Sequence, residues 1–154
     1  GSLYGHSAPI NPLESSKKLF GPNILLGEMM TPEQFENEVA RHFPALKDDV
    51  AENRGLLHVV MGGFYRYTQE HISAESWSEV DRVFRFLEGA YAASLPRTEV
   101  ENAVRASFLE YFDFQNHEER IRGFMGPQFT ALYEDQMRYM ADLARKGAAS
   151  GADR

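Results

Sequence analysis

The segment WSEVDRVFRFLEGAY, residues 77–91, carries the apolar pattern that decides the fold class. Its large apolar side chains recur at spacings of three and four residues: Trp77, Val80, Phe84, Leu87 and Tyr91. This spacing places them on one face of an amphipathic α-helix. Ser76 and Glu79 have the spacing of a capping box at its start. Val83 and Phe86 widen the apolar face, so we expect this helix to contact more than one neighbour.

Four further helices follow from the same criteria on either side of this segment. We expect them over about residues 32–43 and 50–72, after Thr98, and from Gly126-Pro127 to a stop at Gly147. The side chains predicted to be buried on the second and fourth helices are Leu56, Val59, Val60, Phe64, Tyr67, Val100, Val104, Phe108 and Tyr111. No segment alternates as a strand does. The sequence therefore predicts an all-α fold, a compact bundle of about five roughly antiparallel helices.

Two local features qualify these helices. Thr31, Pro32 and Gln34 form a capping box with proline in the first turn, which gives the first helix a defined start. Gly62 and Gly63 lie inside the second helix, where each costs roughly 1 kcal/mol of helix stability. We therefore expect either a bend at this pair or another group packed close to the backbone.

The domain is predicted to cover residues 29–147. Residues 1–28 have scattered prolines and no sustained periodicity, and Met29 or Met30 resembles a native start. We expect residues 1–28 to be a leader, a linker or a fused segment, native or not. Residues 148–154, AASGADR, are predicted to form a flexible tail.

Composition excludes several classes of function. The chain has 154 residues, no cysteine, and a net charge of −7 from 23 acidic and 16 basic residues. A nucleic-acid-binding domain needs clustered lysine and arginine, so nucleic acid is not an expected partner. No apolar run is long enough to span a membrane, and no signal peptide is recognisable. We expect a cytoplasmic protein that does not associate with membranes.

Catalytic and metal-binding motifs are not recognisable. The five histidines form no HxH, HxxxH or HExxH pattern, and no glycine-rich phosphate loop follows a predicted strand. Glu38 and His42 are four residues apart, a spacing more typical of a solvated pair than of half a metal site. We expect no cofactor and no metal.

The fourth helix contains three polar residues among apolar ones. At about 100° per residue, Ser107 falls in the buried stripe, Glu110 at its edge and Asn102 on the far side. They do not converge on one point. The segment ENAVRASFLEYF (101–112) therefore indicates helix packing rather than a catalytic trio.

Four segments of this chain resemble a known kind of family. VENAVRASFLEYF (100–112), FMGPQFTALYEDQMRYM (124–140), MGGFYRYTQEHI (61–72) and VFRFLEGAY (83–91) together resemble a family of small all-helical bacterial proteins of unassigned function. The resemblance covers about residues 31–143 and rests mostly on packing and capping positions. Families of this kind resemble the immunity proteins that bacteria encode beside polymorphic toxins, which implies a non-enzymatic inhibitor.

Three hypotheses about function follow. In the first, a protein partner, for example a basic toxin, binds an acidic surface made of Glu36, Glu38, Asp48, Asp49, Glu52, Glu118 and Glu119. In the second, His58, Tyr67 and Glu110 line a small-ligand or enzymatic pocket near Gly62-Gly63. In the third, the glycine pair and Met137/Met140 mark a packing interface, so that the chain forms a homo-oligomer.

Overall fold

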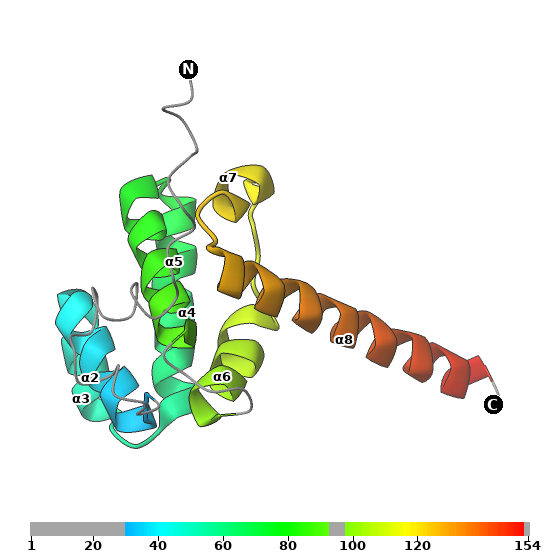
Figure 1. The fold of residues 1–154 in the computed structure, drawn as a ribbon, viewed down its shortest axis with the longest axis horizontal. Coiled ribbons are helices and arrows are strands. Elements are labelled where there is room, and N and C mark those ends of the chain that lie inside the picture. The colour runs from blue at the N-terminus through cyan, green and yellow to red at the C-terminus, as the bar shows by residue number, and fades with distance from the viewer. Residues whose placement is uncertain (1–29, 93–97, 153–154) are drawn as a thin grey trace.

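A computed structural model describes residues 30–92 and 98–152. In these ranges the chain forms seven α-helices, a 3-10 turn and a π-helical turn, and no strand (Figure 1). In chain order they are α2 (Pro32–His42), η2 (Pro44–Leu46), α3 (Lys47–Glu52), α4 (Leu57–Ser73), α5 (Trp77–Ala92), α6 (Glu99–Val104), η3 (Arg105–Leu109), α7 (Glu118–Arg122) and α8 (Pro127–Ala152). The all-α class is confirmed, although the number of helices exceeds the predicted five.

The apolar stripe of α5 forms the centre of the core. Val80, Phe84 and Leu87 are fully buried, as are Val83 and Phe86 on the widened face. A chain of aromatic contacts runs outward from this helix, with ring centroids 5.0 to 6.4 Å apart, and joins it to α2, α4, η3 and α8. The prediction that this helix contacts several neighbours is confirmed.

The start of α2 is capped as its sequence predicts. The Gln34 backbone N–H donates to Thr31 Oγ1 at 3.1 Å, and the Thr31 N–H donates to Gln34 Oε1 at 2.8 Å. The apolar face of this helix, Phe35, Val39 and Phe43, is buried. Local capping therefore sets where this element begins, and burial of its apolar face holds it against the rest of the body.

The second predicted helix is two helices, because the chain breaks at residues 53–56. Gly55 has φ of +84°, a left-handed conformation that a helix interior does not accept. The predicted close approach to the glycine pair occurs at Gly63. A Cβ placed there would lie 2.4 Å from Asp49 Oδ2, so a larger residue at this position would have to displace the carboxylate of α3.

The fourth predicted helix changes its winding after Val104. The Glu110 N–H donates to the Arg105 carbonyl at 3.0 Å, which is the i to i+5 bond of a π-turn. Wider winding moves the later side chains off the register of an ideal α-helix. Phe108 and Leu109 are buried, whereas Tyr111, predicted to be buried, is 73% exposed. The prediction for Tyr111 is wrong for this reason.

A carboxylate from α5 holds the start of α8. The Gln128 and Phe129 N–H groups donate to the two oxygens of Glu88 at 2.9 and 2.7 Å. Gly126, just before the helix, lies against the Glu88 side chain: a Cβ at this position would be 2.4 Å from Glu88 Cδ. Glu88 thus acts as the helix cap that α8 lacks in its own sequence.

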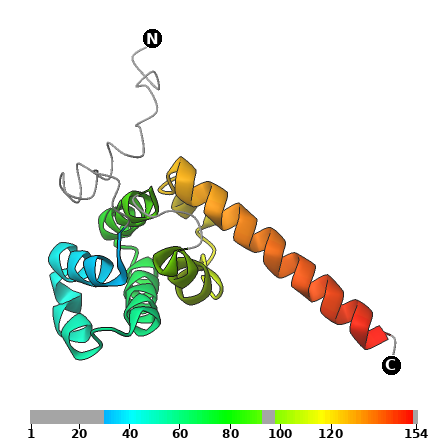
Figure 2. The same cartoon turned by 60° about the horizontal axis from the view of Figure 1, so that its bottom comes forward.

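The last helix corrects the prediction of a compact bundle. Gly147 does not end it, since α8 continues to Ala152. Figures 1 and 2 show that α8 packs on the body by its first turns and then projects away from it. The predicted leader, residues 1–28, and the side chain of Tyr91 lie outside the described residues.

Candidate functional site

An open hollow lies where α4 begins beside α6. It has a volume of about 410 Å³, and its lining comes from the turn before α4, the first turn of α4, and α6: Gly55, Leu56, Leu57, His58, Val59, Glu99 and Asn102. The prediction that Asn102 faces away from the core is confirmed, because this side chain is exposed. The hollow therefore combines apolar side chains with a histidine, an amide and a carboxylate.

The turn that forms one wall of the hollow is tied to α2. The Gly55 N–H donates to Glu36 Oε1 at 3.0 Å, and Arg54 Nη1 donates to Asn37 Oδ1 at 2.8 Å. Glu36 is only 2% exposed. Its expected place on an accessible acidic surface is therefore wrong, because its carboxylate serves the backbone of this turn instead.

A hydrogen bond joins the hollow to the π-turn. His58 Nδ1 lies 2.8 Å from Ser107 Oγ, so the imidazole bridges α4 and η3. Further along, Tyr65 Oη donates to the Tyr111 carbonyl at 2.9 Å, and Gln69 Nε2 donates to the Asp113 carbonyl at 2.9 Å. These three hydrogen bonds join successive turns of α4 to the segment from Ser107 to Asp113, which runs alongside it in the same direction. They hold the His58 side chain at the rim of the hollow.

Two large apolar side chains on the rim are open to solvent. Leu56 is 55% exposed and Val59 is 45% exposed. Both were predicted to be buried, as part of one continuous second helix. Because the chain breaks at residues 53–56, the apolar stripe predicted for one continuous helix does not apply to these two residues. The sequence does contain a signal for this break, namely the turn-forming residues Asn53 and Gly55.

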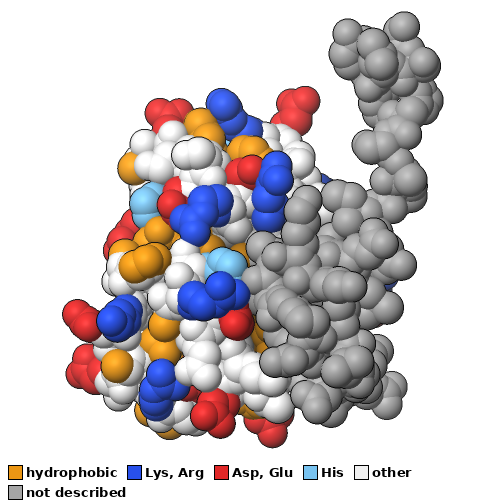
Figure 3. Space-filling view, turned by 60° about the vertical axis from the view of Figure 1, so that its left-hand side comes forward, with side chains coloured by type: hydrophobic (Ala, Val, Ile, Leu, Met, Phe, Trp, Pro, Cys, Tyr) orange, Lys and Arg blue, Asp and Glu red, His pale blue; other side chains and the backbone are white. Residues whose placement is uncertain are grey.

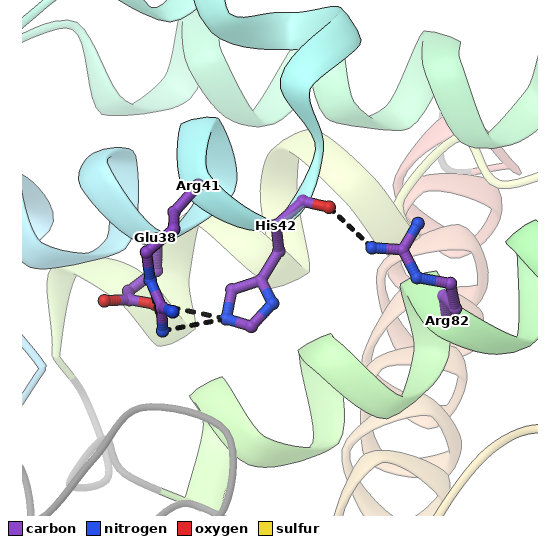
Figure 4. Close-up of polar contacts among 4 residues, drawn as sticks. All are labelled: Glu38, Arg41, His42 and Arg82. Atoms are coloured by element: carbon purple, nitrogen blue, oxygen red, sulfur yellow. Dashed lines mark hydrogen bonds and ion pairs between the residues drawn. The ribbon is translucent and has the colours of Figure 1, made fainter.

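Among the other acids predicted to bind a partner, Glu38 is engaged within α2 (Figure 4). Its Oε2 accepts from Arg41 Nη2 at 2.7 Å and lies 3.2 Å from His42 Nε2. The His42 carbonyl accepts a hydrogen bond from Arg82 of α5 at 2.6 Å. This cluster links the end of α2 to α5.

The remaining acids fall into two groups. Asp48 and Glu52 are exposed on α3, and Asp49 is half-buried beneath them, where Asn53 Nδ2 donates to its Oδ1 at 3.2 Å. Glu118 and Glu119 are exposed on α7, on the opposite side of the body (Figure 1). Basic and acidic side chains are interspersed on the face shown in Figure 3. The seven predicted acids therefore do not form one continuous surface.

The three residues predicted to line a ligand pocket lie at different places in the fold. Of the three, only His58 lines the hollow. Tyr67 lies nine residues further along α4, about 13.5 Å along the axis. There it contacts Phe43 at a centroid distance of 5.8 Å and His71 at 4.4 Å. Glu110 follows η3. Neither of the two hollows, at the start of α4 and along α8, is lined by all three residues.

The surroundings of Tyr67 do alter its acidity. Burial raises the pKa of the Tyr67 phenol to about 12, and the neighbouring carboxylate of Glu79, which accepts a hydrogen bond from it, acts in the same direction. Arg82 opposes this change. The phenol is therefore a structural donor to Glu79 at neutral pH, when it is fully protonated.

Two further structural findings concern function. Within residues 30–92 and 98–152, no group of three or more histidine and acidic side chains has the geometry of a metal site. In the same part of the chain, no helix combines the length and apolar character required to cross a membrane.

Comparison with known proteins identifies a family. The model of a domain of unknown function, DUF7674, matches residues 36–140, more than half of the chain. The chain therefore belongs to the DUF7674 family. No curated protein and no solved structure matches it. The resemblance to an uncharacterised domain family is thereby confirmed, and the match spans the body and both elements that form the hollow.

Proposed function

We propose that this domain is a non-enzymatic protein-binding module whose partner docks over the hollow at the start of α4. In this proposal the bound partner is inhibited, in the way that an immunity protein inhibits its toxin. The observation that carries the proposal is the exposure of Leu56 and Val59 side by side on the rim of the hollow.

The distribution of exposed apolar side chains supports this location. Single exposed hydrophobic residues are common on protein surfaces and need no explanation, whereas adjacent ones around a concavity are typical of binding sites. Of the large hydrophobic side chains exposed on the body, within the described residues, Leu56 and Val59 line the hollow and Tyr111 does not. A partner that inserted an apolar side chain between Leu56 and Val59 would cover both.

Polar groups around the rim favour a partner with basic and hydrogen-bonding side chains. Glu99 and Asn102 supply a carboxylate and an amide on the α6 side. Asp48 and Glu52 are exposed on α3, and Glu52 precedes Gly55 by three residues. The whole chain carries a net charge of −7. These charges would speed association with a basic partner more than they would strengthen the final complex.

Site-specific photo-crosslinking tests the location. A photoreactive amino acid at Val59 should capture one protein in cells that express the chain, whereas the same group at Ala74 should not. Ala74 is exposed and lies just past the other end of α4, so it is a matched control. Equal capture at both positions, or at neither, would refute the location.

Once the captured partner has been purified, its binding to the chain and its inhibition by the chain can be measured separately. The L56K/V59K variant should bind at least about tenfold more weakly, since both apolar contacts are replaced by charges. The D48K/E52K variant should mainly slow association, and the effect should shrink at high salt. Binding that survives L56K/V59K would overturn the site. A partner that keeps its full activity in the complex would overturn the inhibitory role alone.

A further inference from the structure

A second hollow, the α8 hollow, lies where η3 faces α8. It has a volume of about 420 Å³, and every side chain that lines it carries a polar group: Arg105, Asp135, Gln136, Arg138, Tyr139 and Asp142. In Figures 1 and 2, α6 stands between α4 and α8, so the two hollows lie to either side of the α6–η3 segment. The hollow at the start of α4 has two aliphatic side chains on its rim, whereas the α8 hollow has charged ones. The two hollows therefore suit different kinds of group.

The guanidinium of Arg105 is held in place by acceptors from two helices. Its Nε donates to Glu101 Oε1 at 3.1 Å, and its Nη1 lies 2.9 Å from Asp135 Oδ2 of α8. The Glu101 side chain is only 7% exposed, so water competes little for this charged hydrogen bond. A guanidinium fixed in this way loses little further conformational freedom when it binds a ligand.

Two N–H donors in the α8 hollow have no partner in the protein. Arg105 Nη2 and Gln136 Nε2 donate to no group within residues 30–92 and 98–152. Gln136 is nevertheless only 5% exposed, and its Oε1 is turned towards Arg105 Nη1 at 3.4 Å. Its Nε2 is not enclosed by the protein, so the amide opens into the hollow. Because buried polar side chains are nearly always hydrogen-bonded, this amide indicates a partner supplied from outside the chain.

The charges of the α8 hollow indicate the class of that partner. Its carboxylates are already paired: Asp135 with Arg105 and, at 3.6 Å, with Arg138, and Asp142 with Arg145. The groups without a partner are donors, so the missing group is an acceptor. Two arginines and two aspartates line the hollow, which gives it a formal charge of zero. The aspartates would repel a doubly charged phosphate, whereas a singly charged carboxylate matches the planar fork of a guanidinium.

We propose that the α8 hollow binds a small monocarboxylate, whose carboxylate accepts from Arg105 Nη2 and Gln136 Nε2. The exposed ring of Tyr139 offers an apolar face to the remainder of the ligand. Because Arg105 belongs to η3 and Gln136 to α8, the bound carboxylate would join these two elements. This site is separate from the protein-binding hollow and does not depend on the function proposed for it.

Benzoate, benzamide and benzamidine test the charge of the ligand, because they have nearly the same shape and are an anion, a neutral molecule and a cation at neutral pH. Each is titrated into the isotope-labelled full chain, and the NMR signals of the chain are followed. Benzoate should bind saturably, with a dissociation constant on the order of 1 mM, and should shift the side-chain signals of Arg105 and Gln136 most. Benzamide and benzamidine should bind at least about tenfold more weakly, since neither presents a carboxylate to the two donors.

Phenylphosphonate, which can carry a second negative charge, separates a carboxylate from a phosphate-like group. It should bind more weakly than benzoate, because Asp135 and Asp142 repel the added charge. Equal affinity for benzoate and benzamide, tighter binding of phenylphosphonate, or the absence of a saturable shift with benzoate would overturn the proposal.

Two matched substitutions on α8 test the location of the site. Gln136→Met keeps the length of the side chain and removes its donor, so benzoate should bind at least about tenfold more weakly. Gln128→Met makes the same change in the first turn of α8, outside the hollow, and should leave the affinity unchanged. An unchanged affinity in Gln136→Met, or an equal loss in both variants, would overturn the assignment.

Circular dichroism checks that both variants are folded. If Gln136→Met is unfolded, Arg105→Lys takes its place, because it keeps the positive charge beside Glu101 but lacks the planar fork. Arg105→Lys should likewise lower the affinity for benzoate at least about tenfold. A folded Arg105→Lys variant with unchanged affinity would overturn the proposal.

Discussion

The contact between Glu88 and the start of α8 supports a quantitative prediction. Replacing Glu88 by alanine removes both acceptors for the Gln128 and Phe129 N–H groups, which donate to it at 2.9 and 2.7 Å. Loss of a helix cap costs about 0.5–2 kcal/mol, and a hydrogen bond to a charged group contributes about 1.5–3 kcal/mol. Water can reach the half-buried Gln128, so we expect a loss of about 2–3 kcal/mol in the free energy of unfolding.

The contact between Gly126 and Glu88 can be tested by a double-mutant cycle. A Cβ at Gly126 would lie 2.4 Å from Glu88 Cδ and 2.6 Å from its Oε2. Gly126→Ala must therefore displace the carboxylate, and it should cost about as much as Glu88→Ala. In the Glu88→Ala background the space is empty, so the same change should cost much less. We expect a coupling energy of about 1–2 kcal/mol between the two sites.

Urea unfolding followed by far-ultraviolet circular dichroism measures all four corners of this cycle. Asp81→Ala is the control on the same helix: it breaks a surface pair with Arg85 at 3.0 Å and should change stability by no more than about 0.5 kcal/mol. Additive effects of the Glu88 and Gly126 changes would refute the capping explanation. So would a Glu88→Ala variant no less stable than the Asp81→Ala control.

Three further predictions concern α4 and the turn before it. Gly63→Ala would place its Cβ 2.4 Å from Asp49 Oδ2 and must displace this carboxylate, whereas Gly62→Ala has ordinary room and should stabilise the protein by up to about 1 kcal/mol. Gly63→Ala should therefore be the less stable of the two variants, and urea midpoints that rank them the other way would contradict this. Gly55→Ala should cost about 1 kcal/mol because φ is +84° there, and equal urea midpoints for variant and unaltered chain would contradict it. Tyr67 has a folded pKa of about 12 against about 10 when unfolded, so the stability that depends on its protonated form is complete below pH 10 and is lost as the pH rises towards 12. Tyr67→Phe should therefore lose less stability than the unaltered chain between about pH 9 and pH 11.5, and identical losses in urea titrations would contradict the assignment.

Several parts of the candidate site could not have been found from the sequence. Whether Leu56 is buried depends on the exact residue at which α4 begins, and that residue is set by Gly55 and by the Glu36 carboxylate from another helix. Glu36 itself looks like a solvated acid until its partner, 19 residues away, is known. Tyr111 belongs to an apolar stripe only if the helix winds uniformly, and the π-turn before it removes that condition.

The sequence by itself determined the all-α class, the central apolar helix over residues 77–91, and the capped start at Thr31, because periodicity and capping act over a few neighbouring residues. The tertiary structure alone decided which acids are accessible, that Glu88 caps a helix 40 residues further on, and that Leu56 and Val59 remain exposed. These features depend on contacts between segments distant in the chain, and burial is a property of such contacts rather than of a side chain in isolation.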